Sequence, residues 1–149
     1  MLRLSKLTDY ATVILSFMAQ KEAAVHTSVE VAQATGLGEA TVRKLLKKLA
    51  QAGGVVSLRG AKGGYRLARP AEQITVAWVI DVLEGPVALT ECSAHGEHCE
   101  QAQGCQIQGV WEPINRKIQD ALESVTVADL AWPKAPVDEV LVPVASLYR

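Results

Sequence analysis

The 149-residue sequence has few cysteines, few aromatic residues and no long apolar run. No stretch approaches the ~20 consecutive apolar residues that a membrane-spanning helix needs, and the opening MLRLSKLTDY has no apolar segment typical of a secretory signal. These absences argue against a membrane or secreted protein, so we expect a cytoplasmic one. Three cysteines is an odd number, and a reducing cytosol disfavours structural disulfides. Metal binding or redox chemistry is therefore the better interpretation of the cysteines.

The sequence also lacks the patterns typical of an enzyme. It shows no Ser-His-Asp constellation, no phosphate-binding glycine loop and no paired carboxylates in a cleft-like context. A cysteine nucleophile activated by His95 or His98 is the remaining enzymatic hypothesis. It does not explain why the first half of the sequence is basic. We expect no catalytic activity and no small-molecule substrate.

Charge divides the sequence into two unlike halves. Residues 1–70 contain eleven Lys/Arg and four Asp/Glu, whereas residues 71–149 contain four and twelve. A basic half beside an acidic half suggests that the first part binds a polyanion and the second does something else. The alternative is two solvated faces with no partner.

Hydrophobic spacing predicts three helices in the basic half. Apolar residues recur at helical intervals over residues 5–21. A capping box of Thr27 and Glu30 begins a short helix that Gly36 ends. The sequence EATVRKLLKKLAQAG, residues 39–53, then predicts a helix with one apolar and one basic side. A short helix, a glycine-containing turn and a basic helix are typical of a helix-turn-helix.

Two short strands are predicted after these helices. VVSLR and YRLA are rich in β-branched or aromatic residues, and the flexible GAKGG separates them. Three helices followed by such a hairpin make a winged helix. We therefore predict a mainly α protein in which residues 1–70 form a winged helix-turn-helix domain with a two-stranded wing.

The basic helix and the wing are where contacts with double-stranded DNA are expected. Lysine and arginine contacts to phosphates give salt-dependent affinity, while the third helix of such a domain reads base edges in the major groove. Thr41 and Arg43 lie at the exposed start of that helix, so base contact is expected there. Lys44, Lys47 and Lys48 are expected to contact phosphates. The predicted DNA-binding set is Ser28, Thr41, Arg43, Lys44, Lys47, Arg59, Lys62, Gly63, Gly64, Tyr65 and Arg66. Two alternatives stay open: the lysines only solvate the helix, and Tyr65 packs the wing against the core.

The acidic half is predicted to contain two helices around a cysteine loop, over residues 71–131, before an extended or mobile tail at 132–149. VAWVIDVLE follows the cap Thr75 and ends at Gly85. A longer helix is expected over residues 110–125, with Pro113 tolerated in its first turn. Its apolar stripe consists of Ile114, Ile118, Ala121, Leu122 and Val125. We expect this stripe to pair with a second copy, because a two-fold dimer matches a palindromic operator. Packing onto its own domain is the alternative.

All three cysteines fall within ECSAHGEHCEQAQGCQIQ, residues 91–108. Their spacing is not the CxxC of common zinc sites. Cys92, Cys99 and Cys105 could hold an iron–sulfur cluster with a fourth ligand from elsewhere. A zinc site of these cysteines with His98 is a second possibility, and a reversible disulfide switch is a third. Spacing alone leaves the three open.

The opening LRLSKLTDYA, the wing LRGAKGGYRLARP and the three cysteines before the long helix together resemble one family. They are similar to the iron–sulfur-responsive winged-helix regulators that include IscR, NsrR and the SUF-system repressors, over roughly residues 1–130. LSKLTDYATVILSFMA is most similar to the SUF branch. The resemblance implies a homodimer with crossing long helices and cluster ligation by Cys92, Cys99 and Cys105. The first cysteine spacing is one residue longer than is usual in the family.

The fourth ligand differs within that family. IscR-type members use a histidine three residues after the third cysteine, where this sequence has Gln108, a poor iron ligand. NsrR-type members use an aspartate on the first helix of the other subunit, which Asp9 matches. Asp9 is also well placed to be an N-terminal helix charge, and His98 and His95 are local alternatives. We rank the candidates Asp9, His98, His95, Gln108, and prefer a [2Fe–2S] cluster to [4Fe–4S].

The resulting hypothesis is a feedback repressor of iron–sulfur cluster assembly (suf-type) genes. Cluster sufficiency would keep these genes off, and cluster loss would release them. The second hypothesis is a zinc-containing or thiol-redox-switched winged-helix repressor, which keeps every DNA contact and changes only what the cysteine loop holds.

Overall fold

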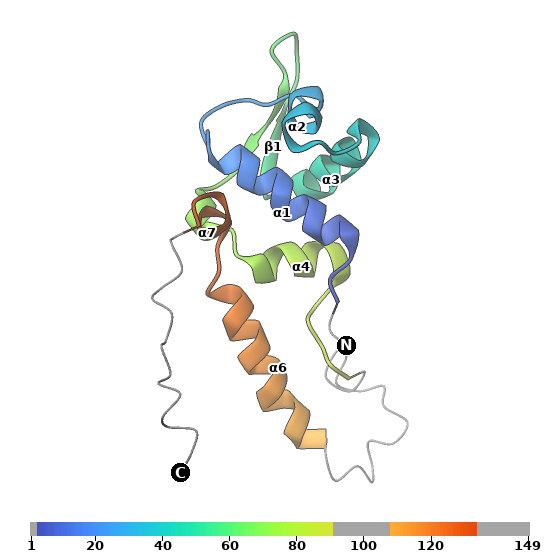
Figure 1. The fold of residues 1–149 in the computed structure, drawn as a ribbon, viewed down its shortest axis with the longest axis vertical. Coiled ribbons are helices and arrows are strands. Elements are labelled where there is room, and N and C mark those ends of the chain that lie inside the picture. The colour runs from blue at the N-terminus through green and yellow to red at the C-terminus, as the bar shows by residue number, and fades with distance from the viewer. Residues whose placement is uncertain (1–2, 91–107, 134–149) are drawn as a thin grey trace, which may run out of the picture.

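The computed structural model describes residues 3–90 and 108–133 of the chain (Figure 1). Helices α1 (Lys6–Ala19), α2 (Ser28–Thr35) and α3 (Glu39–Gln51) come first, followed by strands β1 (Val55–Leu58) and β2 (Gly64–Leu67). The 3-10 turn η1 (Ala71–Gln73) and helices α4 (Val76–Glu84), α6 (Gln108–Glu123) and α7 (Val127–Ala131) follow. The predicted fold class, a mainly α winged helix with a two-stranded wing, is confirmed.

Helix α1 lies at the centre of the core. Its residues Ala11, Ile14, Leu15 and Met18 are fully buried, and the helix contacts α2, α3, α4, α7 and β2. Because residues three and four positions apart share one face of a helix, these four side chains form a continuous apolar stripe around which the other elements pack.

The helix-turn-helix follows the local signals in the sequence. The Thr27 hydroxyl accepts the Glu30 N–H at 3.1 Å, and a Glu30 carboxylate oxygen accepts the Thr27 N–H at 2.7 Å, as the capping box predicts. The backbone and side-chain hydrogen bonds from Thr27 lower the pKa of Glu30. Gly36, with φ of 72°, ends α2 in the left-handed conformation. Helix α3 then buries the apolar side that its sequence predicts, Val42, Leu45, Leu46 and Leu49.

The wing is an antiparallel hairpin in which Val55 pairs with Leu67 and Leu58 with Gly64. The segment before α2 joins it, because His26 and Tyr65 exchange two backbone hydrogen bonds of 2.8 Å each. A Cβ at Gly64 would lie 2.6 Å from the His26 carbonyl oxygen. Glycine at this position is therefore what lets the wing approach the helix-turn-helix so closely.

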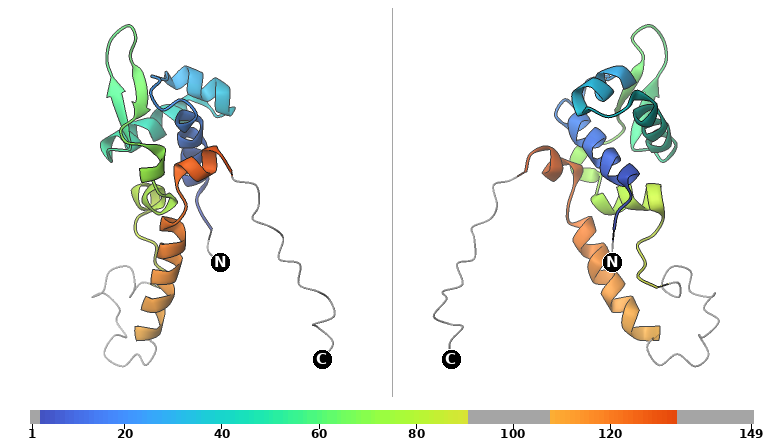
Figure 2. Two further views of the ribbon diagram at one scale, coloured as in Figure 1. Left: turned by 90° about the vertical axis from the view of Figure 1, so that its left-hand side faces the viewer. Right: turned by 45° about the vertical axis from the view of Figure 1, so that its right-hand side comes forward.

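Residues after the wing return to the same core. The Val127 N–H donates to the Ile74 carbonyl at 2.8 Å, and the Val76 N–H donates to the Val125 carbonyl at 2.9 Å. Val127 and Ile74 are fully buried, and α7 lies against α1. Helix α6, by contrast, projects away from the core (Figure 2): its carboxyl end joins α7 and it contacts α4, and the Leu89 N–H donates to the Asn115 side chain at 3.1 Å.

The long helix begins two residues earlier than predicted and ends two residues earlier. Pro113 is therefore an interior residue of α6, not a first-turn one, so it removes a hydrogen bond from the helix. Within the described ranges, no helix has both the length and the apolar character needed to cross a bilayer. Of the tail expected over residues 132–149, all but the first two residues lie outside the described part of the chain.

Glu84 ties the first turn of α1 to the last turn of α4. Its Oε1 atom accepts the Ser5 backbone N–H at 2.8 Å and a hydrogen bond from the Thr8 hydroxyl. Ser5 is the N-cap of α1, and Thr8 is fully buried. The Thr8 hydroxyl first, and then the Ser5 N–H, lower the pKa of Glu84 from its ordinary value of 4.5.

We expect Glu84→Gln to lower the free energy of unfolding by about 1 kcal/mol at pH 7, because charge-assisted hydrogen bonds become neutral ones at a partly screened site. A carboxylate whose pKa is lower in the folded state stabilises the fold at pH values above its pKa in the unfolded state. This stabilisation is lost as the pH falls through the pKa of the folded state. The difference between variant and wild type should therefore shrink below pH 4.5. Urea unfolding at pH 7 and pH 3 measures it. Glu72→Gln, an exposed control, should show no such difference, and an equal deficit at both pH values would contradict the assignment.

Candidate nucleic-acid interface

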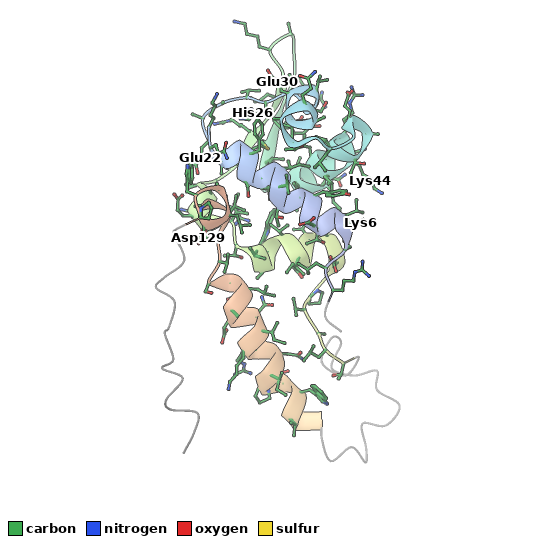
Figure 3. All side chains as sticks on the ribbon, viewed as in Figure 1. Lys6, Glu22, His26, Glu30, Lys44 and Asp129 are labelled. Carbon is green, nitrogen blue, oxygen red and sulfur yellow. The ribbon has the colours of Figure 1, made fainter. Side chains whose placement is uncertain are left out.

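Helix α3 presents a basic side to solvent because its apolar side is buried. Arg43, Lys44, Lys47 and Lys48 are all exposed, and Figure 3 shows Lys44 at the outer surface of α3. A positively charged helix that follows a helix-turn-helix turn has the electrostatic character needed to bind the phosphates beside a major groove.

Arg43 is held by residues of two helices. Its Nη2 atom forms an ion pair with Glu39 on the same face of α3, and its Nε donates to the Ser28 hydroxyl of α2 at 3.4 Å. Ser28, the first residue of α2, and Thr41, in the first turn of α3, are both half-buried. Three of the predicted DNA-binding residues therefore lie together at the amino end of α3.

Lys48 differs from its neighbours. Its Nζ atom donates to the Leu83 carbonyl at 3.2 Å, so it joins α3 to the last turn of α4. We expected Lys48 to contact phosphate. It bonds the Leu83 carbonyl at a helix carboxyl end, where a cation is favoured, and its phosphate contact stays a prediction. Lys44 and Lys47 have no such partner among the residues that the structure describes.

The wing carries the second group of predicted residues. Arg59, Lys62 and Arg66 are exposed. The tip is a tight turn: the Gly63 N–H donates to the Gly60 carbonyl at 2.9 Å, and a Cβ at Gly63 would lie 2.5 Å from the Leu58 carbonyl oxygen. The turn itself therefore requires this glycine. Tyr65 is half-buried and packs against the core, as the alternative interpretation of this residue expected.

We call Arg43, Lys44, Lys47, Arg59, Lys62 and Arg66 the basic surface. It combines one helix and one hairpin, and Figure 1 shows the hairpin rising beside α2 and α3. A helix that fits the major groove and a wing that reaches the adjacent backbone together allow a duplex to be read and held.

The predicted metal ligands are mostly outside the described residues. Cys92, Cys99, Cys105, His95 and His98 all fall in residues 91–107. Gln108 is the first residue of α6. Across residues 3–90 and 108–133, no group of three His, Cys, Asp or Glu side chains is placed to hold a metal ion.

Asp9 is the one cluster-ligand candidate with a described side chain. It is exposed in the first turn of α1, where a negative charge also suits the helix dipole. With Lys6 and Glu84 it lines an open depression of about 550 Å³. Its carboxylate is therefore accessible from outside the subunit.

Sequence reasoning missed two features near the basic surface. His26 is buried beside Phe17, with ring centroids 5.2 Å apart, and its Nε2 has no hydrogen-bond partner within the described part of the chain. No periodic pattern points to this residue. Glu39 could have been found, because an acid four positions before an arginine on a helix is a known pairing.

Comparison with known proteins gives a consistent picture. Residues 4–133 match Rrf2, a family of iron-dependent transcriptional regulators. Protein aau3 of Rhizobium meliloti (strain 1021) is 32% identical over 141 residues, which is 94% of this chain and 92% of that protein.

Two solved structures are also similar. CymR, the global cysteine regulator of B. subtilis, is 32% identical with a TM-score of 0.71, over 91% of this chain and all of that one. IscR of T. potens is 31% identical with a TM-score of 0.65, over 87% and 85%.

Replacing Lys44 and Lys47 together by alanine should weaken binding to any duplex and lower the slope of log affinity against log salt concentration, by about 0.9 for each phosphate that the variant no longer binds. Fluorescence anisotropy with a labelled duplex at several salt concentrations measures both. Lys21→Ala is a single-charge control, since Lys21 is exposed and its chain neighbour Glu22 lies in Figure 3 on the opposite side of the helix-turn-helix from Lys44. Equal slopes for both variants would rule out α3 as the phosphate-binding helix.

Proposed function

The chain belongs to the Rrf2 family of winged-helix transcriptional regulators, which bind DNA and are typically dimeric, and we propose that it is an iron–sulfur-sensing repressor of suf-type cluster-assembly genes. The observation that carries the DNA-binding part is the basic surface. It leaves an arginine and two lysines of α3 and three basic residues of the wing exposed to solvent, where their positive charge can attract a polyanion.

We propose that residues 1–70 bind the operator and residues 71–131 sense and dimerise. The apolar stripe expected on the long helix supports this proposal, although only part of the stripe is exposed for dimerisation. Ile118 and Leu122 are half-buried and line, with Ile80 of α4, an open cavity of about 320 Å³. Ile114, Ala121 and Val125 remain exposed, together with Val110. The stripe thus serves two purposes: part of it packs toward its own domain, and part is left for a second copy.

Dimerisation through that exposed part has a direct test. Ile114→Glu should convert the dimer to a monomer, because it places a charge in an apolar interface. Arg116→Glu introduces the same side chain on the polar side of α6, where it replaces an exposed 3.2 Å ion pair with Glu112 by a like-charge pair, and it should remain dimeric. Analytical ultracentrifugation distinguishes the two. A dimeric Ile114→Glu variant that keeps its helical circular dichroism would contradict this interface.

The donor set of this chain fits an iron–sulfur cluster. Three thiols within residues 92–105 suit cluster iron, and the exposed carboxylate of Asp9 is free to supply a fourth ligand to a partner. Cys92, Cys99 and Cys105 would hold the cluster, [2Fe–2S] preferred, with Asp9 of the partner subunit or the local His98 completing it. When bound, the cluster supplies metal–thiolate bonds that iron limitation or oxidants can remove.

The chain also offers a route from the cysteine segment to the basic surface. Residues 91–107 follow α4 in the chain, and at the end of α4 Lys48 of α3 bonds the Leu83 carbonyl and Glu84 bonds the start of α1. Cluster binding by the cysteine segment would therefore bear on α3 through Leu83, whose carbonyl accepts from Lys48. A coupling of about 1.4 kcal/mol is enough to change operator affinity tenfold.

A thiol- or zinc-dependent repressor is the second candidate. The similarity to CymR, a cysteine regulator, favours it, since two of the three cysteines could form a reversible disulfide. Both candidates use the same DNA contacts and differ only in what the cysteine segment holds.

Anaerobic purification followed by absorption spectroscopy and quantification of iron, sulfide and zinc separates these candidates. We expect charge-transfer bands between about 320 and 420 nm with equal iron and acid-labile sulfide, because thiolate-bound iron absorbs there. The triple variant Cys92→Ser, Cys99→Ser, Cys105→Ser should be colourless. Stoichiometric zinc without iron would establish the zinc site. A protein that stays colourless after cluster reconstitution would favour the thiol switch.

A reporter fused to a suf-type operon tests the physiological part of the proposal. Iron starvation should raise its expression, and deletion of the regulator should remove the response. Unchanged expression on iron starvation would contradict cluster-dependent repression.

A further inference from the structure

Glu39 places a negative charge on the surface proposed to meet DNA. It is the first residue of α3, and 43% of its side chain is exposed. A carboxylate at a helix amino end is favoured by the helix dipole. Facing a duplex, however, it repels phosphates, and each phosphate contact contributes to affinity. Its position therefore calls for an explanation beyond helix stability.

The partner of Glu39 is Arg43, the residue expected to contact bases. Glu39 Oε1 accepts from the Nη2 atom of Arg43, while Ser28 accepts from its Nε. The arginine is thus held from both helices of the helix-turn-helix, although 66% of its side chain is exposed. An arginine guanidinium has five N–H groups in a fixed plane. Two of them are engaged here, and the other three have no partner among the residues that the structure describes.

The remaining N–H groups of the guanidinium match the acceptor pattern of one base, guanine. Guanine presents its O6 and N7 acceptors side by side in the major groove, and arginine binds them through two parallel N–H groups. A guanidinium held on its inner side by Glu39 and Ser28 loses less freedom on binding than a mobile one does. Because Glu39 neutralises its charge, the same guanidinium also gains less from a nearby phosphate.

We propose that Glu39 is a positioning residue for specificity: it directs Arg43 toward a guanine and withholds it from the phosphate backbone. This rests on the proposed function as a DNA-binding regulator. An exposed ion pair within one helix turn contributes little to folding stability, so removing Glu39 changes the choice of DNA more than the fold. Ser28 supports the same geometry from α2.

The test uses the full-length chain and a duplex that the wild-type protein selects from a random-sequence library. Affinities are measured for that duplex, for versions with each G·C pair changed in turn to A·T, and for a poly(dA·dT) duplex. Glu39→Ala should reduce discrimination at one G·C pair about tenfold, since a bidentate contact supplies most of it. Binding to poly(dA·dT) should become equal or tighter, with a salt slope steeper by about 0.9.

Three further variants show whether Glu39 acts through Arg43. Arg43→Ala should lose discrimination at the same base pair, and adding Glu39→Ala to it should change discrimination no further. Glu39→Gln keeps an acceptor oxygen for Arg43 and should retain most of the discrimination. Glu72→Ala, which removes one exposed charge elsewhere on the molecule, should leave discrimination unchanged.

The outcomes separate this inference from the function on which it rests. If the wild-type chain selects no sequence, both are wrong. If it does select one, but Glu39→Ala discriminates as well as wild type or weakens all duplexes equally, the inference alone is wrong. An effect of Glu39→Ala that persists in the Arg43→Ala background would mean simple phosphate repulsion and would also overturn it.

Discussion

Burial of α1 is the constraint on which the other elements depend. Ala11, Ile14, Leu15 and Met18 are fully buried, and full burial of a large aliphatic side chain is worth roughly 1.5–3 kcal/mol. Helices α2, α3, α4 and α7 all contact α1. The elements proposed to read DNA therefore take their relative positions from a helix that contributes no residue to the basic surface, and α7, at the far end of the described chain, helps to bury it.

Local patterns predicted the elements, and distant contacts decided how they fit together. The capping box at Thr27 and the left-handed Gly36 involve residues close in sequence, so the local sequence pattern was enough to predict the helix-turn-helix. Ser5 and Glu84 are 79 positions apart, and no spacing rule pairs them. The docking of α7 likewise uses backbone N–H and carbonyl groups of residues 74–76 and 125–127, and such groups leave no signal in the sequence. Such contacts become visible only when the chain is folded.

The candidate site shows the same division. The charged stripe of α3 predicted which residues face solvent, because the apolar residues opposite them define the buried side. It could not separate Lys47 from Lys48, which are both exposed; the position of α4 does so by offering Lys48 a carbonyl oxygen. Ser28 and Arg43, fifteen positions apart, were both expected at the DNA but not as partners. For the cysteines, the sequence remains the source of the assignment.

The way α6 is attached makes it a lever. Main-chain hydrogen bonds of Val125 and Val127 fix its carboxyl end beside α4, while its amino end, at Gln108, follows the cysteine segment. Sixteen helical residues span about 24 Å at 1.5 Å per residue, so a tilt of about 5° at the carboxyl end moves the amino end by roughly 2 Å. The relation is reversible: a displacement imposed at the amino end reaches α4 as a small rotation of the helix. The length of α6 thus sets how far a displacement at its amino end is reduced before it reaches the core that carries the basic surface.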